Sequence, residues 1–153
     1  MGLRGEVDPG FNVKLKWDID LLSGYNYKFM GSRAFKRTPR GFWSLIVPEV
    51  WFEVRAGNYD AVWLHGYNFA VLWVALFAAK SRGIPVFLRG ETHLDLKKNA
   101  TSRFLHNYIL RYAFRFIDGF FVIGTKNKEY YESLGVTKCK LYDMPYTVDN
   151  AKF

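Results

Sequence analysis

From Ser44 onward, short apolar runs alternate with longer stretches that carry apolar residues at helical spacing. The short runs are rich in β-forming residues and predict strands at Asp60–His65, Ile84–Arg89, Gly119–Ile123 and Cys139–Met144. The longer stretches predict helices at Ser44–Arg55, Phe69–Arg82, Thr101–Ile117 and Thr125–Leu134. Continuous apolar strands that alternate with helices are typical of a parallel sheet buried between helices. The pattern therefore predicts an α/β fold with a Rossmann-like parallel sheet sandwiched by helices.

Capping residues mark the ends of two predicted helices. Gly83 and Gly135 each follow a helical stretch, at the place where a glycine commonly stops a helix. Thr125 is predicted to be the N-cap of the last helix. Near the start of the chain, Val13–Trp17 alternates apolar and basic residues, as an exposed strand does.

Length and composition narrow the class of protein. The 153 residues make about one domain, and half of them are hydrophobic, which excludes intrinsic disorder. The longest apolar run, Phe69–Ala79, is shorter than the roughly 20 residues of a membrane-spanning helix. The polar start Met1–Gly10 lacks the pattern of a signal peptide. Cys139 is the single cysteine, so we expect no internal disulfide and a cytoplasmic location.

The chain is strongly basic, with 22 Lys and Arg against 14 Asp and Glu and a net charge of +8. Such a balance indicates an anionic partner, which is nucleic acid, a membrane surface or a phosphorylated substrate. Two acid-free segments hold much of the excess, and they include Lys36, Arg37, Arg40, Lys97, Lys98, Arg103, Arg111 and Arg115. A solvated protein surface is the simpler interpretation of these residues, and contact with anionic lipid headgroups is the functional one.

The helix predicted at Thr101–Ile117 combines basic and aromatic residues. A polar stripe beside a broad apolar face recurs every four positions, and it consists of Arg103, Asn107, Arg111 and Arg115. That face consists of Phe104, Leu105, Tyr108, Ile109, Tyr112 and Phe116. Because these residues fall at core spacing, we predict that they pack in the interior rather than stack on bases. Nucleic acid is therefore a disfavoured partner.

Polar and titratable residues follow the predicted strands, where ligands of parallel sheets bind. The candidates are His65, Gly66, Tyr67, Asn68, Arg89, Gly90, Glu91, Thr92, Gly124 and Asn127. Each candidate also has a purely structural interpretation. His65 could cap a neighbouring helix, and Glu91 could form an ion pair with Arg89. This pattern predicts a binding edge of the sheet without naming a reaction.

The sequence gives no sign of a cofactor or a metal. It lacks the glycine-rich fingerprint of a dinucleotide site. His93 has no second histidine or cysteine at ligand spacing, so we predict no metal site.

The order of several short motifs resembles the amino-terminal half of family 4 glycosyltransferases, which are retaining enzymes with the two-domain GT-B fold. The motifs are Trp17-Asp18-Ile19-Asp20-Leu21-Leu22, Asp60-Ala61-Val62 with His65-Gly66, Arg89-Gly90-Glu91, Ile123-Gly124-Thr125 with Asn127, and Pro145-Tyr146 with Val148-Asp149-Asn150. The resemblance spans Val13 to Phe153. It implies transfer of a sugar from a nucleotide-sugar donor to a glycan or lipid-linked acceptor, with this domain on the acceptor side.

The resemblance also implies roles for particular residues. His65 matches a histidine at the end of the corresponding strand, and Glu91 stands where many relatives carry a catalytic-site histidine. We therefore assign Glu91 and His65 as candidate catalytic residues. The acceptor cleft would include Arg89, Gly90, Thr92, Gly124, Asn127, Tyr67 and Asn68. Glu91 would position an acceptor hydroxyl or stabilise positive charge on the donor sugar ring. Many relatives work at the inner face of the membrane, where a peripheral location would suit the basic segments.

Two parts of the family pattern have no counterpart in this sequence. Relatives begin with an extra strand–helix–strand unit, so we predict a four-strand parallel core over Asp60–Tyr146, with Val13–Trp17 displaced or paired alone. Relatives also carry a donor-binding domain, which holds the nucleotide sugar. We expect that domain elsewhere in the full-length protein or in a separate chain, and little transfer by this chain alone. The alternative function is a non-catalytic basic α/β module that docks on a membrane surface or nucleic acid.

Overall fold

The computed structural model describes residues 23–31, 41–91 and 100–147, with the backbone alone for residues 100–106. Its elements are the 3₁₀ turn η2 (Phe42–Ser44), α1 (Glu49–Ala56), β1 (Val62–His65), α2 (Ala70–Lys80), β2 (Val86–Arg89), α3 (Ala100–Ala113), η3 (Phe114–Phe116), β3 (Gly119–Val122), α4 (Thr125–Ser133), η4 (Lys138–Lys140) and β4 (Leu141–Asp143). The four strands form one parallel sheet in the order β1-β2-β3-β4. The predicted α/β, Rossmann-like fold with a four-strand parallel core is confirmed.

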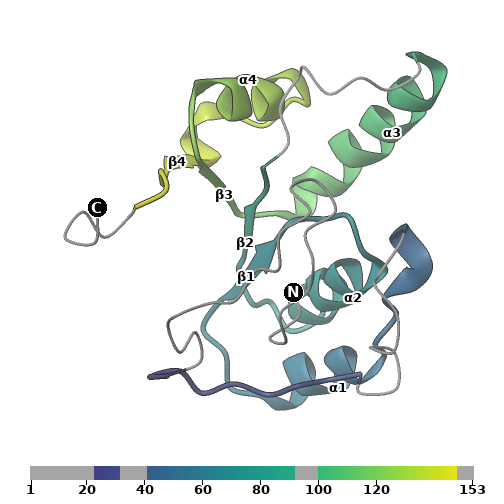
Figure 1. Ribbon diagram of the computed structural model, residues 1–153, viewed down its shortest axis with the longest axis vertical. Helices are drawn as coiled ribbons and strands as arrows, with labels where there is room; N and C mark the ends of the chain where they lie inside the picture. Colours follow the sequence, from purple (N-terminus) through teal and green to yellow (C-terminus); the bar gives the residue numbers. More distant parts are fainter. Residues whose placement is uncertain (1–22, 32–40, 92–99, 148–153) are drawn as a thin grey trace, which may run out of the picture.

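The sheet has one face covered by helices. Because the strand order never reverses, right-handed crossovers bring every connecting helix to the same side of the sheet. Figure 1 shows α2 and α3 on one side of the strands. Leu64, Leu88 and Phe120 lie side by side in the register of the strands, and all three are buried under these helices. Within the described residues, the sandwich of helices is therefore one-sided.

Phe120 lies at the centre of the covered face and has no exposed surface. Its ring centroid lies 4.8 Å from that of Tyr131 on α4 and 5.2 Å from that of Phe114 in η3. On the β1 side, Leu76 and Ala79 of α2 are buried in the same cluster. The hydrophobic core therefore lies between the sheet and a single layer of helices.

The other face of the sheet, which we call the open face, carries a row of aromatic rings. Trp63 is 44% exposed and Tyr142 is 48% exposed. Phe121 lies between them, with ring centroids 5.2 Å from Trp63 and 6.2 Å from Tyr142. Gly119 makes room for this row, because a Cβ there would lie 2.8 Å from the rings of both Phe87 and Tyr142.

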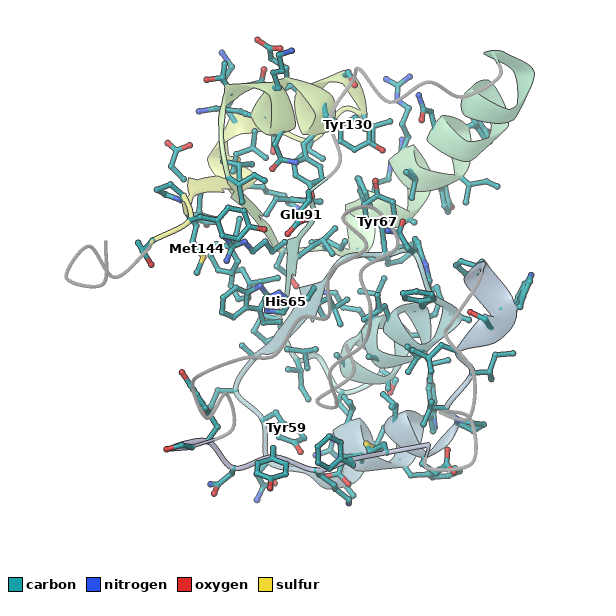
Figure 2. The ribbon with its side chains drawn as sticks, viewed as in Figure 1. Tyr59, His65, Tyr67, Glu91, Tyr130 and Met144 are labelled. Carbon is teal, nitrogen blue, oxygen red and sulfur yellow. The ribbon has the colours of Figure 1, made fainter. Side chains whose placement is uncertain are left out.

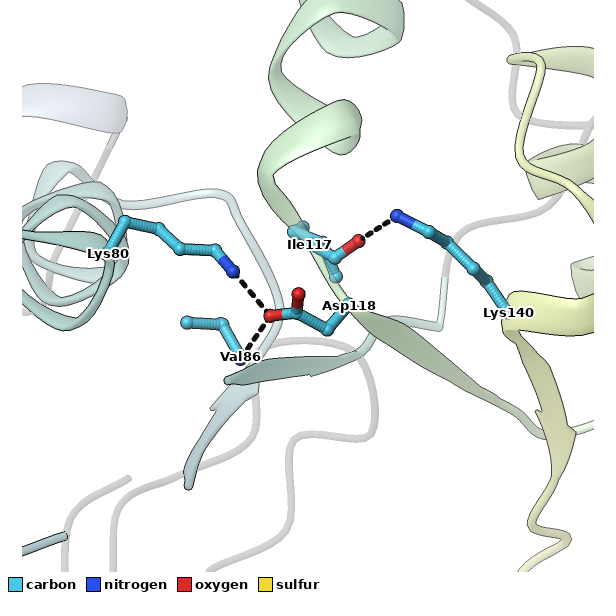
Figure 3. A network of polar contacts seen from close by, with 5 residues as sticks. All are labelled: Lys80, Val86, Ile117, Asp118 and Lys140. Atoms are coloured by element: carbon cyan, nitrogen blue, oxygen red, sulfur yellow. Dashed lines mark hydrogen bonds and ion pairs between the residues drawn. The ribbon is translucent and has the colours of Figure 1, made fainter. Parts of the chain in front are cut away.

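A network of polar contacts lies at the amino-terminal ends of the strands (Figure 3). Asp118 accepts hydrogen bonds from Lys80 Nζ at 2.5 Å and from the backbone N–H of Val86 at 2.7 Å. Lys140 Nζ donates to the Ile117 carbonyl at 2.7 Å. Burial raises the pKa of Asp118, but its bonds to Lys80 and Val86 outweigh this and hold the pKa below its ordinary value. The network joins α2, β2 and β3.

Helix α1 packs on α2 and begins later than predicted. We predicted its start at Ser44, but the helix begins at Glu49, directly after Pro48. A proline disfavours helical dihedral angles at the residue before it, here Val47, so the helix cannot extend backward. The half-buried Glu53 of α1 forms an ion pair with Lys28, which brings the segment 23–31 alongside the helix.

Other element ends differ by a few residues from the prediction. Thr125 is the first residue of α4 rather than its cap, and Gly124 occupies the cap position. Cys139 lies in η4 because the Lys140 N–H bonds to the Thr137 carbonyl, so β4 begins only at Leu141. Gly83 and Gly135 end their helices as predicted, both with positive φ. Val13–Trp17 lies outside the described residues.

Candidate functional site

His65 and Arg89 lie side by side at the carboxyl ends of β1 and β2. They are partners in the strand register, and both side chains project on the open face because Leu64 and Leu88 project on the covered one. The Gly66 N–H donates to the Arg89 carbonyl at 2.6 Å, which continues the pairing beyond β1. Figure 2 shows His65 and Glu91 at this end of the strands. The predicted binding edge therefore brings three of its titratable candidates together.

Arg89 is the most unusual member of this cluster. Its Nε and Nη2 atoms are shielded from solvent, and neither has a hydrogen-bond partner among the described residues. The ring of Tyr146 lies over the guanidinium, with the ring centroid 4.3 Å from Cζ. This stacking provides a cation–π attraction but satisfies neither nitrogen.

Glu91 bonds to Tyr146 rather than to Arg89. The Tyr146 hydroxyl donates a hydrogen bond to Glu91 Oε1, and this bond raises the pKa of Tyr146. The predicted alternative of an Arg89–Glu91 ion pair is not found, since the two ion pairs within the described ranges join other residues. Glu91 itself is exposed at the edge of the sheet.

The environment of His65 favours its neutral form. Partial burial lowers the pKa of His65, the nearby Arg89 guanidinium lowers it further, and the Glu91 carboxylate offsets part of this effect. The imidazole ring packs beside Trp63, with centroids 4.6 Å apart. At neutral pH a neutral imidazole can accept a proton or a hydrogen bond from a hydroxyl group.

Gly90 and Asn127 connect the site to helix α4. Asn127 is 4% exposed, and its Nδ2 donates to the Gly90 carbonyl at 3.0 Å, while its Oδ1 accepts from the Ile123 N–H at 3.3 Å. The amide thus joins the end of β2 to the start of α4. A Cβ at Gly90 would lie 2.7 Å from Tyr131 Oη, which is fully buried. A side chain at position 90 would therefore require the Tyr131 ring or the end of β2 to shift.

The remaining cleft candidates lie in different surroundings. Tyr67 is buried on the helix side of the sheet, where its hydroxyl lies 3.0 Å from that of Tyr130. Burial and this hydrogen bond raise the pKa of Tyr130. Asn68 is exposed on the same side, and Gly124 is exposed at the start of α4. Thr92 lies outside the described residues.

The predicted anion contacts are described only in part. Arg111 of α3 and Arg115 of η3 are exposed, and the guanidinium of Arg115 lies 5.3 Å from the centroid of the Tyr112 ring. Arg103 lies on α3, where the backbone alone is described. The other candidates lie outside the described residues, and they are Lys36, Arg37, Arg40, Lys97 and Lys98.

An apolar groove between α2 and α3 was missed by the sequence analysis. It has a volume of about 1070 Å³, and all its lining residues except Asn68 are apolar or aromatic. Tyr108, Ile109 and Tyr112 of α3 lie along it and are exposed, so the prediction that they pack in the core is wrong. The reason is that Leu110, Ala113 and Phe114 face the core instead, on the adjacent side of the helix. The exposed aromatics share the helical spacing of a core stripe, so their spacing alone could not show that they face solvent.

The structure and the comparisons add three negative findings. Within the described ranges, no group of three or more His, Cys, Asp or Glu side chains is arranged to hold a metal ion. In that same part of the chain, no helix has the length and hydrophobicity needed to cross a membrane. Comparison with family models, with curated proteins and with solved structures gives no match for this chain.

Proposed function

We propose that this chain forms the acceptor-binding part of a retaining glycosyltransferase. The observation that carries the proposal is the meeting of His65, Arg89 and Glu91 at the carboxyl edge of a parallel Rossmann-like sheet. Ligands of such sheets bind at this edge. A saccharide acceptor presents hydroxyl groups and apolar ring faces, and this edge offers hydrogen-bonding groups beside the exposed rings of Trp63 and Tyr146.

In this proposal the two candidate catalytic residues act on the acceptor and on the developing charge. Glu91 accepts a hydrogen bond from an acceptor hydroxyl in place of the one it receives from Tyr146, or its negative charge stabilises positive charge on the donor sugar ring. Neutral His65 accepts a second hydrogen bond from the acceptor. The nucleotide sugar is held by a donor-binding domain, in the full-length protein or in a separate chain.

Saccharide binding to the chain is the direct test of this proposal. A panel of mono- and disaccharides would be screened by saturation-transfer-difference NMR against the chain, Glu91→Gln and the control Glu49→Gln on α1. We expect at least one sugar to give a signal with the chain and the control, and a weaker or absent signal with Glu91→Gln. Equal signals for all three proteins would contradict the role of Glu91. Turnover of a nucleotide sugar by the chain alone would contradict the separate donor domain.

The groove beside α3 favours a second candidate function, docking on an anionic membrane surface. Tyr112 and Phe116 are exposed along the groove, and Arg111 and Arg115 are exposed on the neighbouring side of the helix. Aromatic residues beside arginines are typical of helices that lie in a lipid interface. Attraction between the basic side chains and anionic headgroups would be screened by salt.

Vesicle sedimentation tests this second function. We expect the chain to sediment with phosphatidylglycerol vesicles more than with phosphatidylcholine vesicles, and high salt to reduce the difference. The double variant Tyr112→Ser with Phe116→Ser should bind less, while Glu91→Gln should bind normally. Equal sedimentation of the double variant and the original chain would exclude docking through this groove. Binding to an RNA oligonucleotide but not to either vesicle would favour the disfavoured nucleic-acid alternative.

A further inference from the structure

Arg89 carries a positive charge that no described residue neutralises. The ion pairs of the described ranges are Lys28–Glu53 and Lys80–Asp118, and neither involves Arg89. A guanidinium stays charged at every physiological pH. Donors that are shielded from water and unpaired cost free energy, so native structures usually supply them with an acceptor.

The two unpaired nitrogens of Arg89 lie on one edge of the guanidinium. The N–H groups of Nε and the neighbouring Nη2 point in the same direction, and this edge matches two oxygens of one carboxylate or phosphate. Tyr146 stacks on the flat face of the group, whereas an oxyanion approaches in its plane. The Tyr146 ring is 58% exposed, and a hydrogen bond to Glu91 holds its hydroxyl. The stacked ring therefore does not compete with an oxyanion for the Nε–Nη2 edge.

The neighbours of Arg89 leave this position to an anion from outside. Glu91 is the acidic member of the described cluster, and its described hydrogen bond goes to Tyr146. His65, the register partner of Arg89, can donate one hydrogen bond to an oxyanion. The other groups on this row of the sheet, Phe121 and Tyr142, are aromatic.

We infer that the acceptor carries an oxyanion, as a phosphate ester or a carboxylate, which binds the Nε–Nη2 edge of Arg89. This inference rests on the proposed function and names the class of its substrate. The oxyanion anchors the acceptor on Arg89, and Glu91 receives the reacting hydroxyl after Tyr146 has moved away. The arrangement separates the anchoring charge from the carboxylate that acts at the site of transfer.

Calorimetric titration of the chain distinguishes the two sources of the oxyanion. The probes are glucose and galactose, their 1-phosphates and their uronic acids. We expect an acidic sugar to bind at least tenfold more tightly than its neutral counterpart. A preference for the 1-phosphates indicates a phosphate ester, and a preference for the uronic acids indicates a carboxylate. Both of these outcomes support the inference.

Three variants show whether the preference for acidic sugars depends on Arg89. Arg89→Gln should reduce the affinity for the acidic sugar to that of the neutral one. The matched control is Arg55→Gln, because Arg55 also stacks on an aromatic ring, that of Trp51 at 5.4 Å, but lies on α1. This control should keep the full preference. Tyr146→Ala should keep it, because Tyr146 stacks on the flat face of the guanidinium and not on the edge that binds the oxyanion.

Failure of the inference differs from failure of the proposed function. Equal affinity for neutral and acidic sugars would overturn the inference and leave an acceptor site for neutral sugars. A preference that survives in Arg89→Gln would overturn it as well. Binding of none of the six sugars would contradict both proposals.

Discussion

Consecutive residues of β3 project into two unlike environments. Phe120 is fully buried on the covered face, between the rings of Phe114 and Tyr131. Phe121, the next residue, lies on the open face beside exposed rings. The covered face has the packing of a protein interior, and the open face has the charges and hydrogen-bonding groups. Stability and the candidate chemistry are thus separated across the thickness of one sheet.

This separation explains why the candidate site tolerates unpaired groups. The polar atoms of His65, Arg89 and Glu91 lie outside the core. The free-energy cost of leaving polar groups unpaired there does not disrupt the packing around Phe120. Functional sites commonly hold such costs where the rest of the fold supplies the stability. Variants on the two faces should therefore have different consequences, and they test the comparison directly.

The largest effect is expected from a matched pair of phenylalanine substitutions. Phe120→Ala should lower the free energy of unfolding by about 3–5 kcal/mol, because it leaves a cavity in the core. Phe121→Ala should cost about 1–2 kcal/mol, since its ring contacts neighbours that are themselves partly exposed. Urea denaturation of both variants measures the difference. Equal costs would show that the open face is as tightly packed as the covered one.

Gly90→Ala should disturb the close contact between the end of β2 and Tyr131 of α4. The added methyl group would lie 2.7 Å from Tyr131 Oη, so the end of β2 or the Tyr131 ring has to move. We expect a loss of about 1–3 kcal/mol in stability, the usual range for overpacking. The exposed Gly124, where a Cβ would meet no atom within 4 Å, provides the control Gly124→Ala. A similar small effect for both variants would contradict the close approach at Gly90.

Asp118 should contribute through both of its hydrogen bonds. Asp118→Ala leaves the Val86 N–H without its acceptor and should cost about 1–3 kcal/mol. Asp118→Asn keeps an acceptor and loses the exposed ion pair with Lys80, so it should cost about 1 kcal/mol or less. The measurement is the midpoint of thermal unfolding for each variant. A larger loss in the Asn variant would contradict this order.

The contribution of Asp118 should also depend on pH. Its pKa is lower in the folded chain than in the unfolded chain, so ionisation favours folding. The stabilisation is complete above the ordinary carboxyl pKa of about 3.9 and is lost as the pH falls through the lowered folded value. The stability difference between the chain and Asp118→Asn should therefore shrink in acid. A constant difference from pH 7 to pH 2 would contradict the lowered pKa.

The smallest effect is expected on His65. Arg89→Gln removes a neighbouring positive charge, so the pKa of His65 should rise toward its ordinary value. Glu91→Gln removes a negative charge and should lower the same pKa. NMR titration of the His65 ring protons measures both. Shifts in the same direction in the two variants would exclude the proposed arrangement of charges around His65.

Much of the fold could be predicted from the sequence, because the strands of a parallel sheet have a local signature. The runs at Ile84–Arg89 and Gly119–Ile123 contain β2 and β3, and the residues that follow them lie at the predicted edge. The side on which a residue projects was harder to predict. Tyr67 and Arg89 both follow or end a strand, yet one is buried under helices and the other lies on the open face.

The contacts that sequence reasoning missed are those between distant positions. Tyr146 meets Glu91 across 55 positions of the chain, and no local pattern marks such a pair. The aromatic stripe of α3 was misplaced because Tyr108 and Tyr112 have the same spacing whether they face the core or solvent. Strand order was equally hidden, and it decides that the helices cover one face within the described residues.

The central claim is that a saccharide binds at the open face, at the carboxyl ends of β1 and β2. The most direct measurement is a series of ¹H–¹⁵N correlation spectra of the labelled chain, titrated with the sugar that binds best in the screen. We predict that the largest shifts occur at His65, Arg89, Gly90 and Glu91. Largest shifts along the groove between α2 and α3 would contradict the claim and move the site to the helix side of the sheet.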